Sequence, residues 1–93
     1  MKNEPSIEFT PFFNKQRKAA PLEIKKAFRE NLLLFIDDPD HSVLRNHALK
    51  GKYTGYRSID VIEDWRAIFK VTRTGKRKII TLHMLGTHKK LYR

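Results

Sequence analysis

The chain has 93 residues, no cysteine and a formal net charge of +10. This length corresponds to a single domain spanning residues 1–93. The lack of cysteine excludes a disulfide framework, thiol catalysis and any cysteine-based zinc site. No segment approaches the roughly 20 apolar residues of a membrane helix, and the first residues do not resemble a signal peptide, so we expect a cytoplasmic protein without a membrane partner. The strong positive charge indicates a nucleic-acid partner.

The N-terminal half is expected to contain one strand followed by helices. Alternating apolar and polar residues over Ile7–Thr10 predict a short strand that ends at Pro11. The basic segment 12–20 is compatible with one short helix, and Pro21 is expected to be the first residue of the next. A helix over 22–36 is predicted by apolar residues that recur at spacings of three and four: Ile24, Phe28, Leu32 and Phe35.

The C-terminal half has the period of two that is typical of strands. A polar loop is expected over 41–55, and the segments 56–62, 65–72 and 78–85 are rich in β-branched and aromatic residues. Short polar reversals separate these three segments, which predicts an antiparallel meander. The complete order, β-α(α)-β-β-β, predicts an α+β domain in which the N-terminal helices pack on one side of a sheet.

Four motifs follow one another in the second half of the chain. They are Leu44–Gly51 (LRNHALKG), Gly55–Ile59 (GYRSI), Asp64–Lys70 (DWRAIFK) and Gly86–Tyr92 (GTHKKLY). This pattern resembles the RelE/ParE toxin superfamily, and most of all its YafQ-like branch, in which NHxLxG, GYR, DWRxIY and GTHxxLY occur in this order. The resemblance implies a RelE-like fold with a small, curled, antiparallel-rich sheet. It also implies the toxin of a type II toxin-antitoxin system, neutralised by a cognate antitoxin protein.

The activity implied by the resemblance is that of an endoribonuclease, an mRNA interferase that cleaves translated messenger RNA on the ribosome. Such cleavage uses the adjacent 2′-hydroxyl as nucleophile, so the enzyme must accept a proton, donate a proton and stabilise charge on the phosphate. We expect no metal, no organic cofactor and no small-molecule ligand. Two other functions stay open: a ParE-like inhibitor of DNA gyrase, and a non-catalytic RNA-binding module.

His88 is the best catalytic candidate because an imidazole can accept or donate a proton near neutral pH. It follows Gly86, which is expected to let the chain turn at the end of the last strand. By the resemblance, His88, His47 and Asp64 match active-site residues of the YafQ-like pattern. A surface histidine and a turn aspartate are the structural alternatives for the last two.

Two positions depart from the YafQ-like pattern. Asp60 occupies the place of a family histidine, and Met84 occupies the place of the arginine that stabilises the phosphate. A nearby cation would have to take over that role, and the candidates are Arg57, Arg66 and Lys70. The neighbouring His83 is not expected to replace residue 84, because adjacent residues of a strand point to opposite faces.

The C-terminal residues form a second group of candidates for binding RNA. Tyr92 follows Lys89 and Lys90, and aromatic rings beside cations are the usual means of stacking single-stranded bases and holding their phosphates. The alternative is that Tyr92 only attaches the tail to the sheet.

Overall fold

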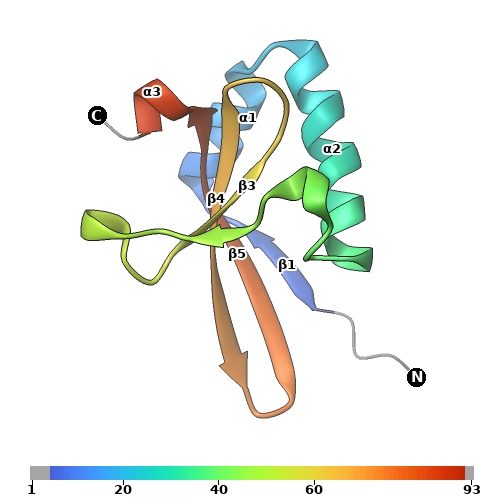
Figure 1. The fold of residues 1–93 in the computed structure, drawn as a ribbon, viewed down its shortest axis with the longest axis vertical. Helices are drawn as coiled ribbons and strands as arrows, with labels where there is room; N and C mark the ends of the chain where they lie inside the picture. The colour runs from blue at the N-terminus through green and yellow to red at the C-terminus, as the bar shows by residue number, and fades with distance from the viewer. Residues whose placement is uncertain (1–4, 92–93) are drawn as a thin grey trace.

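The structure, a computed structural model, describes residues 5–91. Two helices, α1 (Pro11–Ala19) and α2 (Leu22–Asp37), lie against a sheet, as Figure 1 shows, and this confirms the predicted α+β fold. Among the described residues, no helix is long and apolar enough to cross a membrane.

The sheet has five strands in the order β1-β5-β4-β3-β2. These are β1 (Ser6–Phe9), β2 (His47–Ala48), β3 (Arg57–Asp60), β4 (Trp65–Thr74) and β5 (Arg77–Thr87). The first strand is parallel to β5, and the other pairs are antiparallel, so the sheet is mixed and contains the predicted meander. It is open and uncurled rather than curled, and its edges, β1 and β2, span only four and two residues.

Four short elements were not expected from the sequence. The segment assigned to a loop contains β2 and two short 3-10 helices, η1 (Ser42–Leu44) and η2 (Gly51–Tyr53), and a helical turn, α3 (His88–Leu91), follows β5. Elements of two to four residues are too short to produce a recognisable period in the sequence. Both β2 and α3 carry candidate residues of the active site.

The two main helices begin after residues that differ in how they cap the helix. The hydroxyl of Thr10 accepts a hydrogen bond from the backbone N–H of Phe13 at 3.0 Å, and Pro11 occupies the first turn of α1. Pro21 is the residue before α2 rather than its first residue. The side chain of Thr10 therefore caps α1, whereas α2 begins after Pro21 without a side-chain cap.

The hydrophobic core lies between the helices and one face of the sheet. The rings of Phe13 and Phe28 are 5.2 Å apart, and those of Phe35 and Phe69 are 5.0 Å apart at a steep angle. All four side chains are at most 3% exposed. Rings of this size dominate the energetics of a small core, so this face of the sheet carries most of the stability.

A β-bulge interrupts the alternation of β5. The residues of β4 pair in the order Ile68 with Met84 and Phe69 with Leu82, which leaves His83 as an additional residue. As a consequence Leu82 and Leu85 both reach the core, and neither His83 nor Met84 belongs to it. The expectation that residues 83 and 84 point to opposite faces is therefore wrong, because it assumed an uninterrupted strand.

Candidate active site

A pocket of about 240 Å³ brings together three of the residues that were selected from the sequence. Its lining consists of Arg45, His47, Leu49, Arg66 and His88. These residues come from the segment around β2, from the start of β4 and from α3. Arg66 stands between Trp65 and the core residue Ala67, and since side chains alternate along a strand, Arg66 points away from the helices. The pocket lies on the face of the sheet that does not carry the core.

His47 is exposed on β2, where it pairs with Ser58 of β3. Its Nδ1 lies 2.8 Å from the backbone oxygen of Arg45. A carbonyl oxygen can only accept a hydrogen bond, so Nδ1 carries the hydrogen and the lone pair of the neutral ring is on Nε2. The neighbouring backbone thereby fixes the tautomer in which Nε2 is the atom able to accept a proton.

His88 is the first residue of α3 and is exposed to solvent. Its backbone N–H donates a hydrogen bond to the backbone oxygen of Asp64 at 2.8 Å, which joins α3 to the turn before β4. Gly86 does not act as a turn, because its φ is not in the left-handed region. Instead, a β-carbon on Gly86 would lie 3.3 Å from Cδ2 of Leu91. The glycine provides room for Leu91, the last residue of α3, to pack on β5, and this contact helps to position His88 at the start of α3.

Arg66 is held from two sides and is only 16% exposed. Its Nε lies 3.0 Å from Oδ1 of Asp60, and its Nη1 donates to the backbone oxygens of Glu63 and Trp65. The second oxygen of Asp60 lies 3.6 Å from Nε of Arg45. One carboxylate therefore holds two guanidinium groups at the pocket, and the remaining nitrogen donors are available for an anion.

Asp60 and Arg45 were not selected as site residues from the sequence. Asp60 was noted only as a departure from the family pattern, and Arg45 is two residues before His47 in the same motif. Their roles depend on the pairing of β3 with β4, which places Asp60 opposite Arg66. One sign of this role was visible in the sequence: Asp60 places a carboxylate where the family pattern has a histidine.

Three further candidates are outside the pocket lining. Asp64 contacts His88 through its backbone oxygen, and its side chain is exposed. Arg57 donates from Nε to Oδ1 of Asn46 at 2.9 Å, which braces the segment before His47. The ammonium group of Lys70 lies 5.4 Å from the centre of the Tyr56 ring, farther along β4. Of the three cations proposed for the phosphate, the structure brings only Arg66 to the two histidines.

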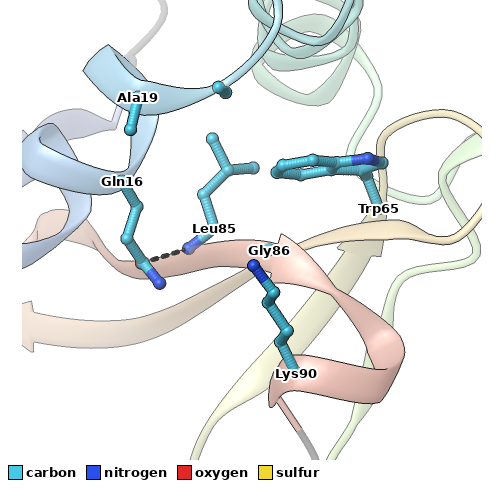
Figure 2. A pocket seen from close by; sticks show the side chains of 7 residues that line it. Gln16, Ala19, Trp65, Leu85, Gly86 and Lys90 are labelled. Atoms are coloured by element: carbon cyan, nitrogen blue, oxygen red, sulfur yellow. Dashed lines mark hydrogen bonds between the residues drawn. The ribbon is translucent and has the colours of Figure 1, made fainter.

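Lys90, one of the C-terminal candidates, lines a different pocket. Lys89 and Lys90 are exposed on α3, and Lys90 lines a pocket of about 180 Å³ on the helix side of the sheet. Figure 2 shows this pocket between α1 and the end of β5, with Gln16 accepting a hydrogen bond from the backbone of Leu85 and the indole of Trp65 on its other side. Tyr92 lies outside the described residues.

His83 is close to the cation of Lys70 and to an aromatic ring. Its ring is 5.1 Å from that of Tyr56, edge to face. Partial burial lowers the pKa of His83, and the positive charge of Lys70 lowers it further. His83 is therefore neutral at physiological pH and does not replace the positive charge that Met84 lacks.

Solved structures with this fold are small bacterial toxins of the RelE-like class. A YoeB/ParE toxin from Agrobacterium tumefaciens has a TM-score of 0.73 at 14% identity over 89% of this chain and 98% of its own. YafQ from Escherichia coli has a TM-score of 0.78 at 26% identity over 97% of this chain and 100% of its own. The YafQ chain of the E. coli DinJ-YafQ toxin-antitoxin complex has a TM-score of 0.76 at 26% identity, with 97% and 99% covered.

The sequence narrows this class to one family. The chain belongs to the YafQ family, described as bacterial toxins of type II toxin-antitoxin systems, whose family model matches residues 6–93. The mRNA interferase toxin YafQ of E. coli strain K12 is 31% identical over 90 residues, which cover 92% of this chain and 94% of that protein. The resemblance seen in the four motifs is thereby confirmed.

Proposed function

We propose that this toxin is an endoribonuclease that cleaves messenger RNA at the pocket of His47, Arg66 and His88. The observation that supports this proposal best is that two histidines and an anchored arginine line the same pocket. These are the groups that metal-independent cleavage requires. The E. coli relative is named an mRNA interferase, which supports the same reaction for this chain.

In the proposed reaction, the 2′-hydroxyl of the substrate attacks the adjacent phosphorus. Nε2 of His47 accepts the proton of this hydroxyl, since Nδ1 is engaged with the backbone. The O2′–P bond forms while the P–O5′ bond breaks, and His88 donates a proton to the departing O5′. The products are a 2′,3′-cyclic phosphate and a 5′-hydroxyl.

Arg66 is proposed to stabilise the negative charge that builds on the phosphate, with Arg45 as a second cation. Asp60 serves as a positioning residue because it contacts both guanidinium groups. Asp64 is proposed to position His88 through the backbone contact rather than to exchange protons. Arg57, Lys70, Lys89 and Lys90 remain proposals for binding the RNA chain outside the pocket.

The proposed substrate is mRNA during translation on the ribosome, which would place the toxin in the cytoplasm. A cognate antitoxin is the proposed protein partner, because the E. coli relative occurs in a toxin-antitoxin complex named DinJ-YafQ. The net charge of +10 suits an acidic partner as well as RNA. Inhibition of gyrase is less well supported, since it gives no role to the two histidines of the pocket.

The test compares His47→Ala and His88→Ala with His41→Ala. His41 lies outside the pocket, and its ring contacts the backbone N–H of Val43, so it is a matched control for loss of an imidazole. We expect both pocket variants to lose about 100- to 10,000-fold in cleavage of a translated message, measured by primer extension together with growth arrest. The control variant should cleave and arrest growth as the wild type does.

Melting temperatures decide whether a loss of activity is a loss of fold. Exposed histidines replaced by alanine should change stability by only about 0.5 kcal/mol. If both pocket variants fold and still arrest growth, while neither they nor the wild type cleave RNA, the ribonuclease proposal is wrong and gyrase becomes the first target to test.

A further inference from the structure

The hairpin of β4 and β5 carries a second concentration of positive charge, away from the active site. Residues 70–78 include no acidic residue and five cations: Lys70, Arg73, Lys76, Arg77 and Lys78. None of these five forms an ion pair with another described residue. All except the half-buried Lys78 are exposed.

The hairpin extends beyond both neighbouring strands. The pairing of β3 with β4 ends at Phe69, and the pairing of β1 with β5 begins at Ile79. The hairpin therefore projects from the rest of the sheet, as the lower part of Figure 1 shows, and it reverses through a tight turn at Gly75, whose φ is +61°. Because no other strand of the described residues 5–91 pairs with it, this part of the hairpin contributes little to the core.

The register distributes the cations over both faces of the hairpin. Arg73 lies directly opposite Lys78, and Thr74 lies opposite Arg77. Residues directly opposite share a face and successive residues alternate, so one face carries Arg73 and Lys78 and the other carries Arg77. Like charges in opposite positions destabilise a sheet, and the nearest acidic residue by register, Glu8, is level with Lys70 at the base of the hairpin.

Protection of an exposed strand edge against aggregation explains part of this charge. Lysine on edge strands prevents pairing with other chains, but charges of either sign would serve that purpose. It does not explain why all five charges are positive or why two of them face each other. A negatively charged ligand would explain both features, because its binding would relieve the repulsion between the facing cations Arg73 and Lys78.

We propose that this hairpin binds the phosphate backbone of double-helical RNA, at a site separate from the catalytic pocket. The proposal rests on the proposed function, which brings the toxin to RNA. Cations on both faces suit a groove with phosphates on two sides. The hairpin contains no aromatic residue from 70 to 78, so it lacks the rings on which single-stranded bases stack.

The distance between the two sites makes them independent. Arg66 is near the start of β4, which spans 10 residues. At about 3.3 Å per residue, the turn of the hairpin lies roughly 30 Å from Arg66. We expect the pocket to act on the message while the hairpin holds a folded RNA segment nearby.

The experiment compares two triple variants that lose the same charge. Arg73→Gln, Lys76→Gln and Arg77→Gln neutralise the hairpin, while Lys15→Gln, Lys26→Gln and Arg29→Gln remove three exposed charges from α1 and α2. Both are made with His88→Ala so that the probes stay intact. The probes are an RNA duplex, a DNA duplex of the same sequence and a single-stranded RNA, each followed by fluorescence anisotropy as the salt concentration is varied.

For the RNA duplex, the hairpin variant should reduce the salt slope by about three, roughly one for each phosphate that is no longer neutralised. Its affinity at moderate salt should fall by roughly 10- to 100-fold, with a much smaller decrease for the helix variant. An equal decrease in both variants would mean that only net charge matters, and equal binding of the DNA duplex would mean that the site is not for RNA. Either result overturns the proposal.

A cleavage assay with His88 restored separates this proposal from the proposed function. The hairpin variant should cleave a short single-stranded RNA at the wild-type rate, and loss of that activity would place the hairpin in the active site and contradict the proposal. If the wild type cleaves no RNA but the hairpin effect persists, the proposed function fails and the hairpin site stands. If the hairpin variant binds RNA normally but no longer binds the antitoxin, the partner of the hairpin is a protein and the proposal is wrong. Melting curves and the single variant Lys76→Gln, in the exposed turn, exclude misfolding as the cause.

Discussion

The two faces of the sheet differ in almost every property, although the same strands form both. On the helix side, β4 and β5 present Ala67, Phe69 and Leu82 to an apolar core that is nearly inaccessible to solvent. On the other side, β4 and β2 present Arg66 and His47 to the candidate active-site pocket. One face is organised by the packing of rings and the other by charges and hydrogen bonds.

Stability and the proposed chemistry depend on alternate residues of one segment. In Trp65–Arg66–Ala67, the two outer residues pack on the helix side and the middle one holds the phosphate in our proposal. Substitutions on the helix side should therefore change the free energy of unfolding, and substitutions on the pocket side should change the rate of cleavage. Residues that connect the two faces should change both.

The largest expected effect is on the helix side. Phe28→Ala removes a ring that is 2% exposed and contacts Phe9 and Phe13, so we expect a decrease of about 3 to 5 kcal/mol in the free energy of unfolding. Urea denaturation measures this decrease. The control is Leu33→Ala on the same helix, whose side chain is 60% exposed and should cost about 0.5 kcal/mol or less. If Phe28→Ala fails to fold, Phe28→Leu should fold with a smaller decrease, and similar decreases for Phe28→Leu and Leu33→Ala would refute the assignment of the core.

On the pocket side, Arg66→Ala should act on catalysis. Loss of a group that stabilises charge in the transition state typically costs roughly 100- to 1,000-fold in rate. We expect this effect in single-turnover cleavage of RNA. Arg29→Ala, an exposed arginine of α2, is the matched control and should cleave normally. A variant at residue 66 that unfolds more easily but cleaves at the normal rate would show that Arg66 is structural.

Gly86→Ala tests a residue that connects the faces. The added methyl group would lie 3.3 Å from Leu91, which must move by a few tenths of an ångström and carries α3 and His88 with it. We expect a cost of about 1 kcal/mol in stability and a larger proportional loss of cleavage. Leu91→Ala makes room for the added methyl group. Gly86→Ala should therefore reduce stability and cleavage less in the Leu91→Ala background than in the wild type. Additive effects of the two substitutions would show that they do not interact.

The smallest effect concerns the pH dependence of stability. The pKa of His83 is lowered in the folded state from its ordinary value of 6.5, so below that pH the unfolded chain binds a proton more readily than the folded one. The contribution of His83 to stability is therefore present above pH 6.5 and decreases as the pH falls toward the pKa of the folded state. His83→Gln should make the decline with falling pH shallower, as measured by urea denaturation above and below pH 6.5. An identical decline in both proteins would contradict this account.

Much of the fold was predictable because its long elements have clear periods. The helix predicted over 22–36 is observed as Leu22–Asp37, and the three C-terminal strands form the expected meander. The features that the sequence did not predict are local. A bulge of one residue at His83 leaves no sequence period to detect, and β2 is held by its pairing with β3 rather than by its own composition.

The residue types of the candidate site could be named from the sequence, but the contacts between these residues could not. His88 could be selected because an imidazole transfers protons near neutral pH, and His47 because it matches a motif of the family pattern. Arg66 was only one of three cations that could bind the phosphate. That Arg66 rather than Arg57 or Lys70 joins the histidines depends on strand register, as does the contact of Asp60 with two arginines. Such long-range contacts cannot be read from the spacing of residues along the chain.

The position of β5 has a consequence for the order of events during synthesis. This strand lies between β1 and β4 in the sheet but is the last strand along the chain, and Ser6 pairs with Ile79. Contacts between segments so far apart in sequence form slowly, because a long loop must close before they add any stability. The helices emerge from the ribosome before β4 and β5, whose residues Phe69 and Leu82 belong to the same core as the aromatic side chains of the helices. The nascent chain therefore has neither a complete sheet nor a complete active site until β5 and His88 have been synthesised.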